Sequence, residues 1–210
     1  MPLVDVPLPP VPDRLPHPLR RFLAEADKRV DEMLKDALIP GFVPGDYEGL
    51  AKLLAALLDG PTLRGTCFCE WGSGLGVATG VAGLTGYDAY GIETEWPLVE
   101  AARQLADDFD VPAEFAHGSY IPPAGEEFVM KSGNYSWLHT DADHTYHDLG
   151  LDVDDFDVIY AYSWPDEEQV AADLFERYGG VGAILVSYRG GDGFRLRRKV
   201  ERRGKRHGRP

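Results

Sequence analysis

The stretch CEWGSGLGVATG, residues 69–80, places four glycines directly behind a glutamate and a tryptophan. A short apolar run over 66–70 leads into it, and residues 75–84 have the character of a helix, so the glycines are predicted to form a strand-to-helix turn. Glycine lets the backbone approach a ligand closely, and a helix N-terminus presents free amide groups. The stretch therefore predicts a ligand-binding turn at the carboxyl end of a strand.

The same alternation of short apolar runs and helical segments continues on both sides of this turn. The predicted strands span 66–70, 89–93, 113–117, 156–162 and 180–188, and the predicted helices between them span 75–84, 97–109 and 165–178. Two amphipathic helices, over 19–37 and 46–58, come first. Such a βαβ series is typical of an α/β fold with a doubly wound, mostly parallel Rossmann-like sheet.

Composition divides the chain into three parts. Residues 1–18 are proline-rich and are predicted to be a flexible start, residues 19–194 form one domain that includes the two N-terminal helices, and residues 195–210 form a basic tail. The tail holds nine Lys/Arg and one acid, which leaves 12 Lys/Arg against 34 Asp/Glu in the first 194 residues. An acidic body argues against a broad nucleic-acid-binding face, whereas the tail suits contact with an acidic partner or serves only as a solubilising end.

The start of the chain lacks the charged and apolar regions of a signal peptide, and the sequence holds no apolar run of membrane-spanning length. We therefore expect a cytoplasmic protein without a membrane partner.

The residues around the glycine turn restrict the class of ligand. A dinucleotide fingerprint that began at Gly72 would need its third glycine at position 77, which is Val77. Glu70 would repel a pyrophosphate but suits an ammonium group. Glu93 ends the next predicted strand, where a carboxylate can accept hydrogen bonds from both hydroxyls of a ribose. An ammonium group and a ribose without phosphates describe S-adenosylmethionine.

Four motifs occur in one order along residues 42–188: EWGSGLG, YGIE, AHGSY and FDVIYAYSWP. Together they resemble the class I, Rossmann-like, S-adenosylmethionine-dependent methyltransferases. The resemblance implies that Glu70 lies near the methionine ammonium, that the turn glycines line the methionine and ribose, that Glu93 holds the ribose and that Ser119 lies beside the adenine. The turn glycines concerned are Gly72, Gly74 and Gly76.

The sequence departs from that family at two places. The adenine-side position is often acidic in the family, but here it is Ser119. The family usually completes its sheet with a sixth strand, a helix and a seventh strand, whereas only GFRLRRKV and the basic tail follow the fifth strand here. We therefore expect a sheet that is shortened at its C-terminal end. Residues 41–58, with their FVP turn, are similar to the N-terminal cover of the Dot1 and related mitochondrial protein-lysine methyltransferases.

The methyl acceptor is predicted to bind at the end of the fourth strand of the series. The substrate-side candidates there are Tyr162, Ser163 and Trp164, and YSWP loosely resembles the Asn/Asp-Pro-Pro-Tyr motif of amino-group methylators. Ser163 can accept one hydrogen bond from an amine, and Trp164 can stack on a flat or cationic group. Alternating aromatic residues in a strand are also typical of a core, and that reading stays open for Tyr162 and Trp164.

Residues 118–155 form a connection longer than a simple crossover needs. Within it, EFVMKSGNYSWLHT predicts a hairpin that turns at 132–134 and acts as a lid. The following HTDADHTYH contains His139, His144 and His147, but their spacing matches no compact metal-ligand motif, so we assign no metal.

The sequence thus predicts an S-adenosylmethionine-dependent methyltransferase whose acceptor is a protein amine, an RNA or a small molecule. A non-catalytic S-adenosylmethionine-binding module is the first alternative. A nicotinamide-dependent oxidoreductase is the second, and both Val77 and Glu70 count against it.

Overall fold

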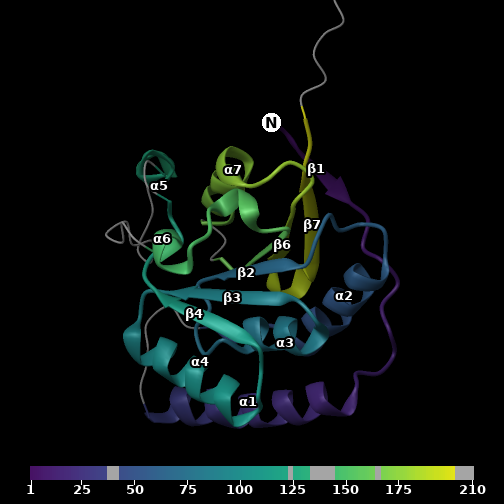
Figure 1. The fold of residues 1–210 in the computed structure, drawn as a ribbon, viewed down its shortest axis with the longest axis vertical. Helices are drawn as coiled ribbons and strands as arrows, with labels where there is room; N and C mark the ends of the chain where they lie inside the picture. Colours follow the sequence, from purple (N-terminus) through teal and green to yellow (C-terminus); the bar gives the residue numbers. More distant parts are fainter. Residues whose placement is uncertain (37–42, 123–124, 133–144, 164–166, 202–210) are drawn as a thin grey trace, which may run out of the picture.

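The computed structural model describes residues 1–36, 43–122, 125–132, 145–163 and 167–201. Within them a seven-stranded sheet separates two layers of helices (Figure 1), with α1 to α4 on one face and α5 to α7 on the other. The chain is therefore an α/β protein with a Rossmann-like arrangement. No described helix is long and apolar enough to cross a membrane.

The strands are β1 (Leu3–Val6), β2 (Cys67–Trp71), β3 (Asp88–Glu93), β4 (Ala113–His117), β5 (Val158–Ala161), β6 (Ile184–Tyr188) and β7 (Phe194–Lys199). The helices are α1 (His17–Asp36), α2 (Tyr47–Asp59), α3 (Val77–Thr85), α4 (Trp96–Asp108), α5 (Glu126–Ser132), α6 (Thr145–Leu149) and α7 (Glu168–Tyr178), with short 3₁₀ helices η1 (Val153–Asp155) and η2 (Gly190–Asp192). The sheet order is β1-β7-β6-β5-β2-β3-β4. Strands β2 to β6 run parallel, and β7 is antiparallel to both of its neighbours.

The five predicted parallel strands are confirmed, as are the two helices that precede them. Helix α2 begins as its sequence predicts, because the Asp46 carboxylate accepts a hydrogen bond from the Gly49 amide at 2.8 Å. Two cores result. Side chains such as Phe22, Leu54 and Phe68 fill the layer under α1 to α4, while Phe156 and Phe175 belong to the layer under α5 to α7.

The N-terminal residues correct two predictions. Residues 3–6 are not a flexible start, because they form β1 and pair antiparallel with β7, from Leu3 opposite Lys199 to Val6 opposite Leu196. The sheet is consequently not shortened, since β7 and β1 extend it beyond β6. Part of the predicted basic tail is strand β7. The four-residue β1 is flanked by prolines, which an edge strand tolerates, and its partner lies at the far end of the chain.

The connection between β4 and β5 also differs from its prediction. Residues 126–132 form helix α5 and not the first arm of a hairpin. The remainder of the predicted hairpin, together with His139 and His144, lies outside the described residues.

Candidate functional site

The glycine turn connects β2 to α3 at the carboxyl edge of the sheet. Gly72, Gly74 and Gly76 have φ values of 75°, 53° and 68°, a left-handed conformation that favours glycine at all three positions. The amides of Gly72 and Ser73 both donate to the Ile92 carbonyl, at 3.0 and 2.9 Å. The turn is therefore held against the end of β3.

Two of these glycines have different surroundings. A Cβ atom at Gly72 would meet no atom within 4 Å, so this residue faces open space. A Cβ at Gly76 would lie 2.5 Å from the Phe115 ring and 2.8 Å from the Ala102 Cβ. Gly72 thus leaves room for a ligand, whereas Gly76 allows close packing of the start of α3 against β4 and α4.

Glu70, the penultimate residue of β2, is buried with 5% of its surface exposed. Its Oε2 accepts hydrogen bonds from the Thr79 amide at 2.8 Å and the Thr79 Oγ1 at 2.7 Å. Burial raises the pKa of Glu70 to about 8, against the opposing effect of these two hydrogen bonds. The negative charge of Glu93 raises this pKa further. A ligand cation placed beside Glu70 would favour the ionised carboxylate.

Glu93 ends β3 and reaches back to the turn. Its Oε2 accepts a hydrogen bond from the Gly74 amide at 2.8 Å, and its Oε1 accepts from the Glu95 amide at 3.0 Å and the Thr94 hydroxyl at 3.2 Å. With 9% of its surface exposed, this carboxylate is held in one orientation. The structure therefore brings Glu70, Gly72, Gly74 and Glu93 together at one edge of the sheet.

Ser119 lies after β4, at the same edge. It is 2% exposed, and its Oγ accepts a hydrogen bond from the Ile121 amide at 3.0 Å. The Gly118 amide donates to the Glu93 carbonyl at 2.8 Å, which ties this turn to the end of β3. Ser119 is thus close in the fold to Glu93, and its hydroxyl takes part in its own turn.

Trp96 and His117, which the sequence reasoning did not select, lie at this edge as well. Trp96 begins α4 with half of its surface exposed, and its ring lies edge-on to His117 at 5.3 Å between centroids. The Arg103 guanidinium lies 5.3 Å from the Trp96 ring centre. An exposed indole three residues after Glu93 offers a flat stacking surface. The signal in the sequence was a tryptophan just before the first-turn Pro97.

The acceptor-side candidates lie at the end of β5. Tyr162 and Ser163 are half-buried, and the Tyr162 ring packs edge-on against Tyr188 with 4.9 Å between centroids. Trp164, the third candidate, lies outside the described residues. Because Glu70 of β2 pairs in register with Tyr160 of β5, the end of β5 lies directly beside the glycine turn.

Among the residues that the structure describes, two buried hydroxyls in this region have no hydrogen-bond partner: Ser73 Oγ in the turn and Tyr160 Oη on β5. Buried polar groups are nearly always hydrogen-bonded in folded proteins. Two such hydroxyls at one strand edge are what a site for a polar ligand provides.

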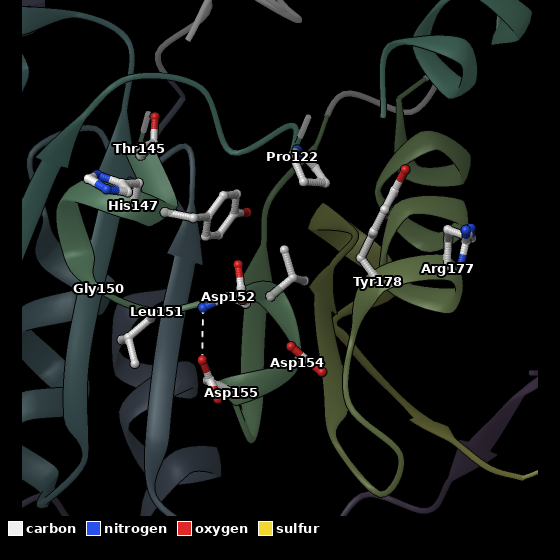
Figure 2. Close-up of a pocket in the computed structure, with 12 residues that line it drawn as sticks. Pro122, Thr145, His147, Gly150, Leu151, Asp152, Asp154, Asp155, Arg177 and Tyr178 are labelled. Atoms are coloured by element: carbon white, nitrogen blue, oxygen red, sulfur yellow. Dashed lines mark hydrogen bonds between the residues drawn. The ribbon is translucent and has the colours of Figure 1, made fainter. Parts of the chain in front are cut away.

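A separate cavity of about 760 Å³ lies between α6, η1 and α7. Figure 2 shows Pro122 and Thr145 at this cavity, with Tyr178 on the α7 side. Asp155 accepts a hydrogen bond from the Asp152 amide at 2.8 Å there. None of the predicted site residues lines this cavity. Among the described residues, no three His, Cys, Asp or Glu side chains are grouped to hold a metal ion.

No protein-family model matches the sequence, and a search of curated proteins finds no match. Solved structures do resemble it. An RNA methyltransferase from Salinibacter ruber, crystallised with S-adenosyl-L-homocysteine, is 18% identical; the alignment covers 91% of this chain and 97% of that chain, with a TM-score of 0.45.

Two further solved structures have similar values. A methyltransferase from Geobacter sulfurreducens is 14% identical over 90% of this chain and 93% of its own, with a TM-score of 0.49. An O-methyltransferase from Bacillus cereus, in complex with S-adenosyl-L-homocysteine, is 12% identical. The alignment covers 83% of this chain and 67% of that chain, with a TM-score of 0.48. At such identities the likeness concerns the fold alone.

Proposed function

We propose that this protein binds S-adenosylmethionine at the glycine turn and transfers its methyl group to an acceptor at the end of β5. The observation that carries the proposal is the convergence of two buried carboxylates, Glu70 and Glu93, on a turn of three left-handed glycines. One of these glycines, Gly72, faces open space. Two carboxylates in this position suit a ligand with an ammonium group and hydroxyls, and disfavour a pyrophosphate.

The residues present fit each part of this cofactor. Glu70 would lie toward the ammonium group. The Glu93 carboxylate keeps acceptor capacity for one ribose hydroxyl, since an ionised carboxylate offers about four lone-pair positions and three of them accept hydrogen bonds here. Gly72 and Gly74 would line the methionine and ribose. Gly76, in contrast, contributes to the site by allowing close packing behind the turn. Ser119 stays the candidate for the adenine side, and the exposed Trp96 indole adds a stacking surface there.

When bound, S-adenosylmethionine supplies a methyl group on a positively charged sulfur, and the leaving thioether keeps the electron pair of the broken carbon–sulfur bond. The protein's part is to hold the acceptor in line and to exclude water. The half-buried Tyr162 and Ser163 at the end of β5 are our candidates for that task, because β5 pairs with the strand that leads into the glycine turn. No side chain of a catalytic triad is needed for such a displacement.

The finer predictions from the sequence remain proposals. They are the likeness of residues 41–58 to protein-lysine methyltransferases, the cytoplasmic location, and contact of the basic tail with an acidic partner. Neither the non-catalytic module nor the nicotinamide-dependent oxidoreductase is favoured by a specific feature of the structure. Val77, at the position of the third dinucleotide glycine, is a buried residue of α3.

Calorimetric titration with S-adenosylmethionine, S-adenosylhomocysteine and NAD tests the proposal. We expect both adenosyl ligands to bind and NAD not to bind. Glu93→Gln should weaken adenosyl binding by about 5- to 150-fold, because a charged hydrogen-bonding group contributes about 1–3 kcal/mol. The matched control is Glu114→Gln, which removes an exposed carboxylate from β4. Absence of adenosyl binding to the folded protein would refute the proposed function.

Glu70 offers a second readout of the same titration. Its raised pKa means that it is largely protonated near neutral pH in the free protein, and a bound ammonium group would lower that pKa. Binding at pH 7 should therefore release a proton, detected as a dependence of the measured heat on the buffer's ionisation enthalpy. Glu70→Gln should abolish that dependence.

A further inference from the structure

Four tyrosines gather beside Glu70 on the face of the sheet that α2 covers: Tyr47 from α2, Tyr160 and Tyr162 at the end of β5, and Tyr188 from β6. Tyr162 and Tyr188 are in edge-on contact. A Cβ atom at Gly45 would lie 3.3 Å from the Tyr160 hydroxyl and 3.7 Å from each of the Tyr47 and Tyr162 rings. We refer to these four residues as the tyrosine cluster.

Of the four tyrosines, Tyr160 has a hydroxyl that is buried without a hydrogen-bond partner among the described residues. Tyr160 is 1% exposed, and its hydroxyl has no hydrogen-bond partner within the described ranges of the chain. The buried Tyr87 shows the usual arrangement, because its hydroxyl donates to the Leu54 carbonyl at 2.9 Å. Since an unpaired buried hydroxyl destabilises a fold, its presence next to partly exposed rings indicates a place for a ligand's polar group.

Acidic side chains border the cluster. Glu70 raises the pKa of both Tyr47 and Tyr160, Asp46 raises the pKa of Tyr188, and Asp27 adds to the effect on Tyr47, in each case beyond the effect of burial. Asp46 lies at the start of α2, where its carboxylate caps the helix. Aromatic faces attract cations, and a cation bound beside Glu70 would also favour the ionised form of that carboxyl group. An anion such as phosphate gains neither interaction.

We propose that the tyrosine cluster binds the ammonium group of the methyl acceptor, which is therefore an amine. This inference rests on the proposed function, because it places the acceptor beside the cofactor at the glycine turn. The tyrosine rings contact the cation, and the Tyr160 oxygen accepts a hydrogen bond from its N–H. For transfer, the ammonium loses one proton to water, the freed pair forms the bond to the methyl carbon, and the carbon–sulfur bond breaks with its pair remaining on sulfur.

A matched pair of probes separates cation binding from simple apolar binding. Choline and 3,3-dimethylbutan-1-ol have nearly the same shape. The central atom is a positively charged nitrogen in choline and a neutral carbon in the alcohol. Titrated by NMR into the full-length protein saturated with S-adenosylhomocysteine, choline should bind about 3- to 30-fold more tightly. Tyr162→Leu should remove that preference. Tyr178→Leu, which replaces a half-buried tyrosine on α7 in the opposite layer, should retain it.

The binding of S-adenosylhomocysteine to each variant is measured first and keeps two failures distinct. If S-adenosylhomocysteine binds but choline shows no advantage over the neutral alcohol, the amine inference is overturned and the proposed function stands. If S-adenosylhomocysteine does not bind the folded protein, the proposed function fails and the acceptor assignment fails with it. A preference for choline that Tyr162→Leu leaves unchanged would also overturn the inference.

Discussion

The glycine turn and the tyrosine cluster lie side by side at one edge of the sheet, yet they differ in how their polar groups are satisfied. At the turn, Glu70 and Glu93 accept five hydrogen bonds from backbone amides and hydroxyls. In the cluster, the Tyr160 hydroxyl has no partner, and three of the four rings are half-buried. The carboxylates of the first region are organised before any ligand arrives, although the buried Ser73 hydroxyl of the turn has no partner among the described residues. The second region is completed by what binds there. Such a difference is what we expect if the glycine turn binds the cofactor and the tyrosine cluster binds the methyl acceptor.

The largest expected change in the free energy of unfolding comes from substitutions at two glycines of the turn, Gly76 and Gly72. Gly76→Ala should lower the free energy of unfolding by roughly 2–5 kcal/mol, because it combines a left-handed backbone with a clash against Phe115. Gly72→Ala should cost only about 1–2 kcal/mol, since its Cβ enters open space, but it should weaken adenosyl binding. Urea denaturation and calorimetry measure the two effects. Equal destabilisation by both changes would contradict the different roles of these glycines.

The buried Glu70 predicts a dependence of stability on pH. Its pKa is about 8 in the folded protein and close to the ordinary 4.5 in the unfolded chain. The folded state therefore binds more protons between these values, and the stability contributed by Glu70 falls as pH rises from about 5 to 8.

A single such group produces a slope of at most about 1.4 kcal/mol per pH unit. We expect urea denaturation across this range to show the fall and Glu70→Gln to flatten it. A slope unchanged in Glu70→Gln would assign the dependence to other groups.

The smallest expected effect distinguishes satisfied from unsatisfied tyrosine hydroxyls. Tyr87→Phe should cost about 1 kcal/mol of unfolding free energy, because it removes the hydrogen bond to Leu54. Tyr160→Phe should leave the free protein equally stable or slightly more stable, since it removes a buried hydroxyl without a partner. Thermal denaturation of both variants checks this. A large loss of stability in Tyr160→Phe would mean that its hydroxyl already has a partner in the free protein.

The predictions that agree with the structure rest on patterns among residues that are close together in the sequence. The alternation of short apolar runs and helical segments located β2 to β6, and Asp46 predicted the start of α2. The hairpin prediction over 127–140 failed at its first arm, where α5 forms. A short run of three apolar residues between polar ones does not separate a short helix from a strand without its packing partners.

The glycine turn and its two glutamates were determined by the sequence alone. Their signal is the spacing of residues within one strand, turn and strand, and parallel strands bring their carboxyl ends to one edge. Only the tertiary structure decided that Leu3–Val6 completes the sheet, and that Tyr47 joins Tyr160, Tyr162 and Tyr188 around Gly45. These contacts join residues separated by more than a hundred positions, so the order of neighbours along the chain contains no pattern that specifies them.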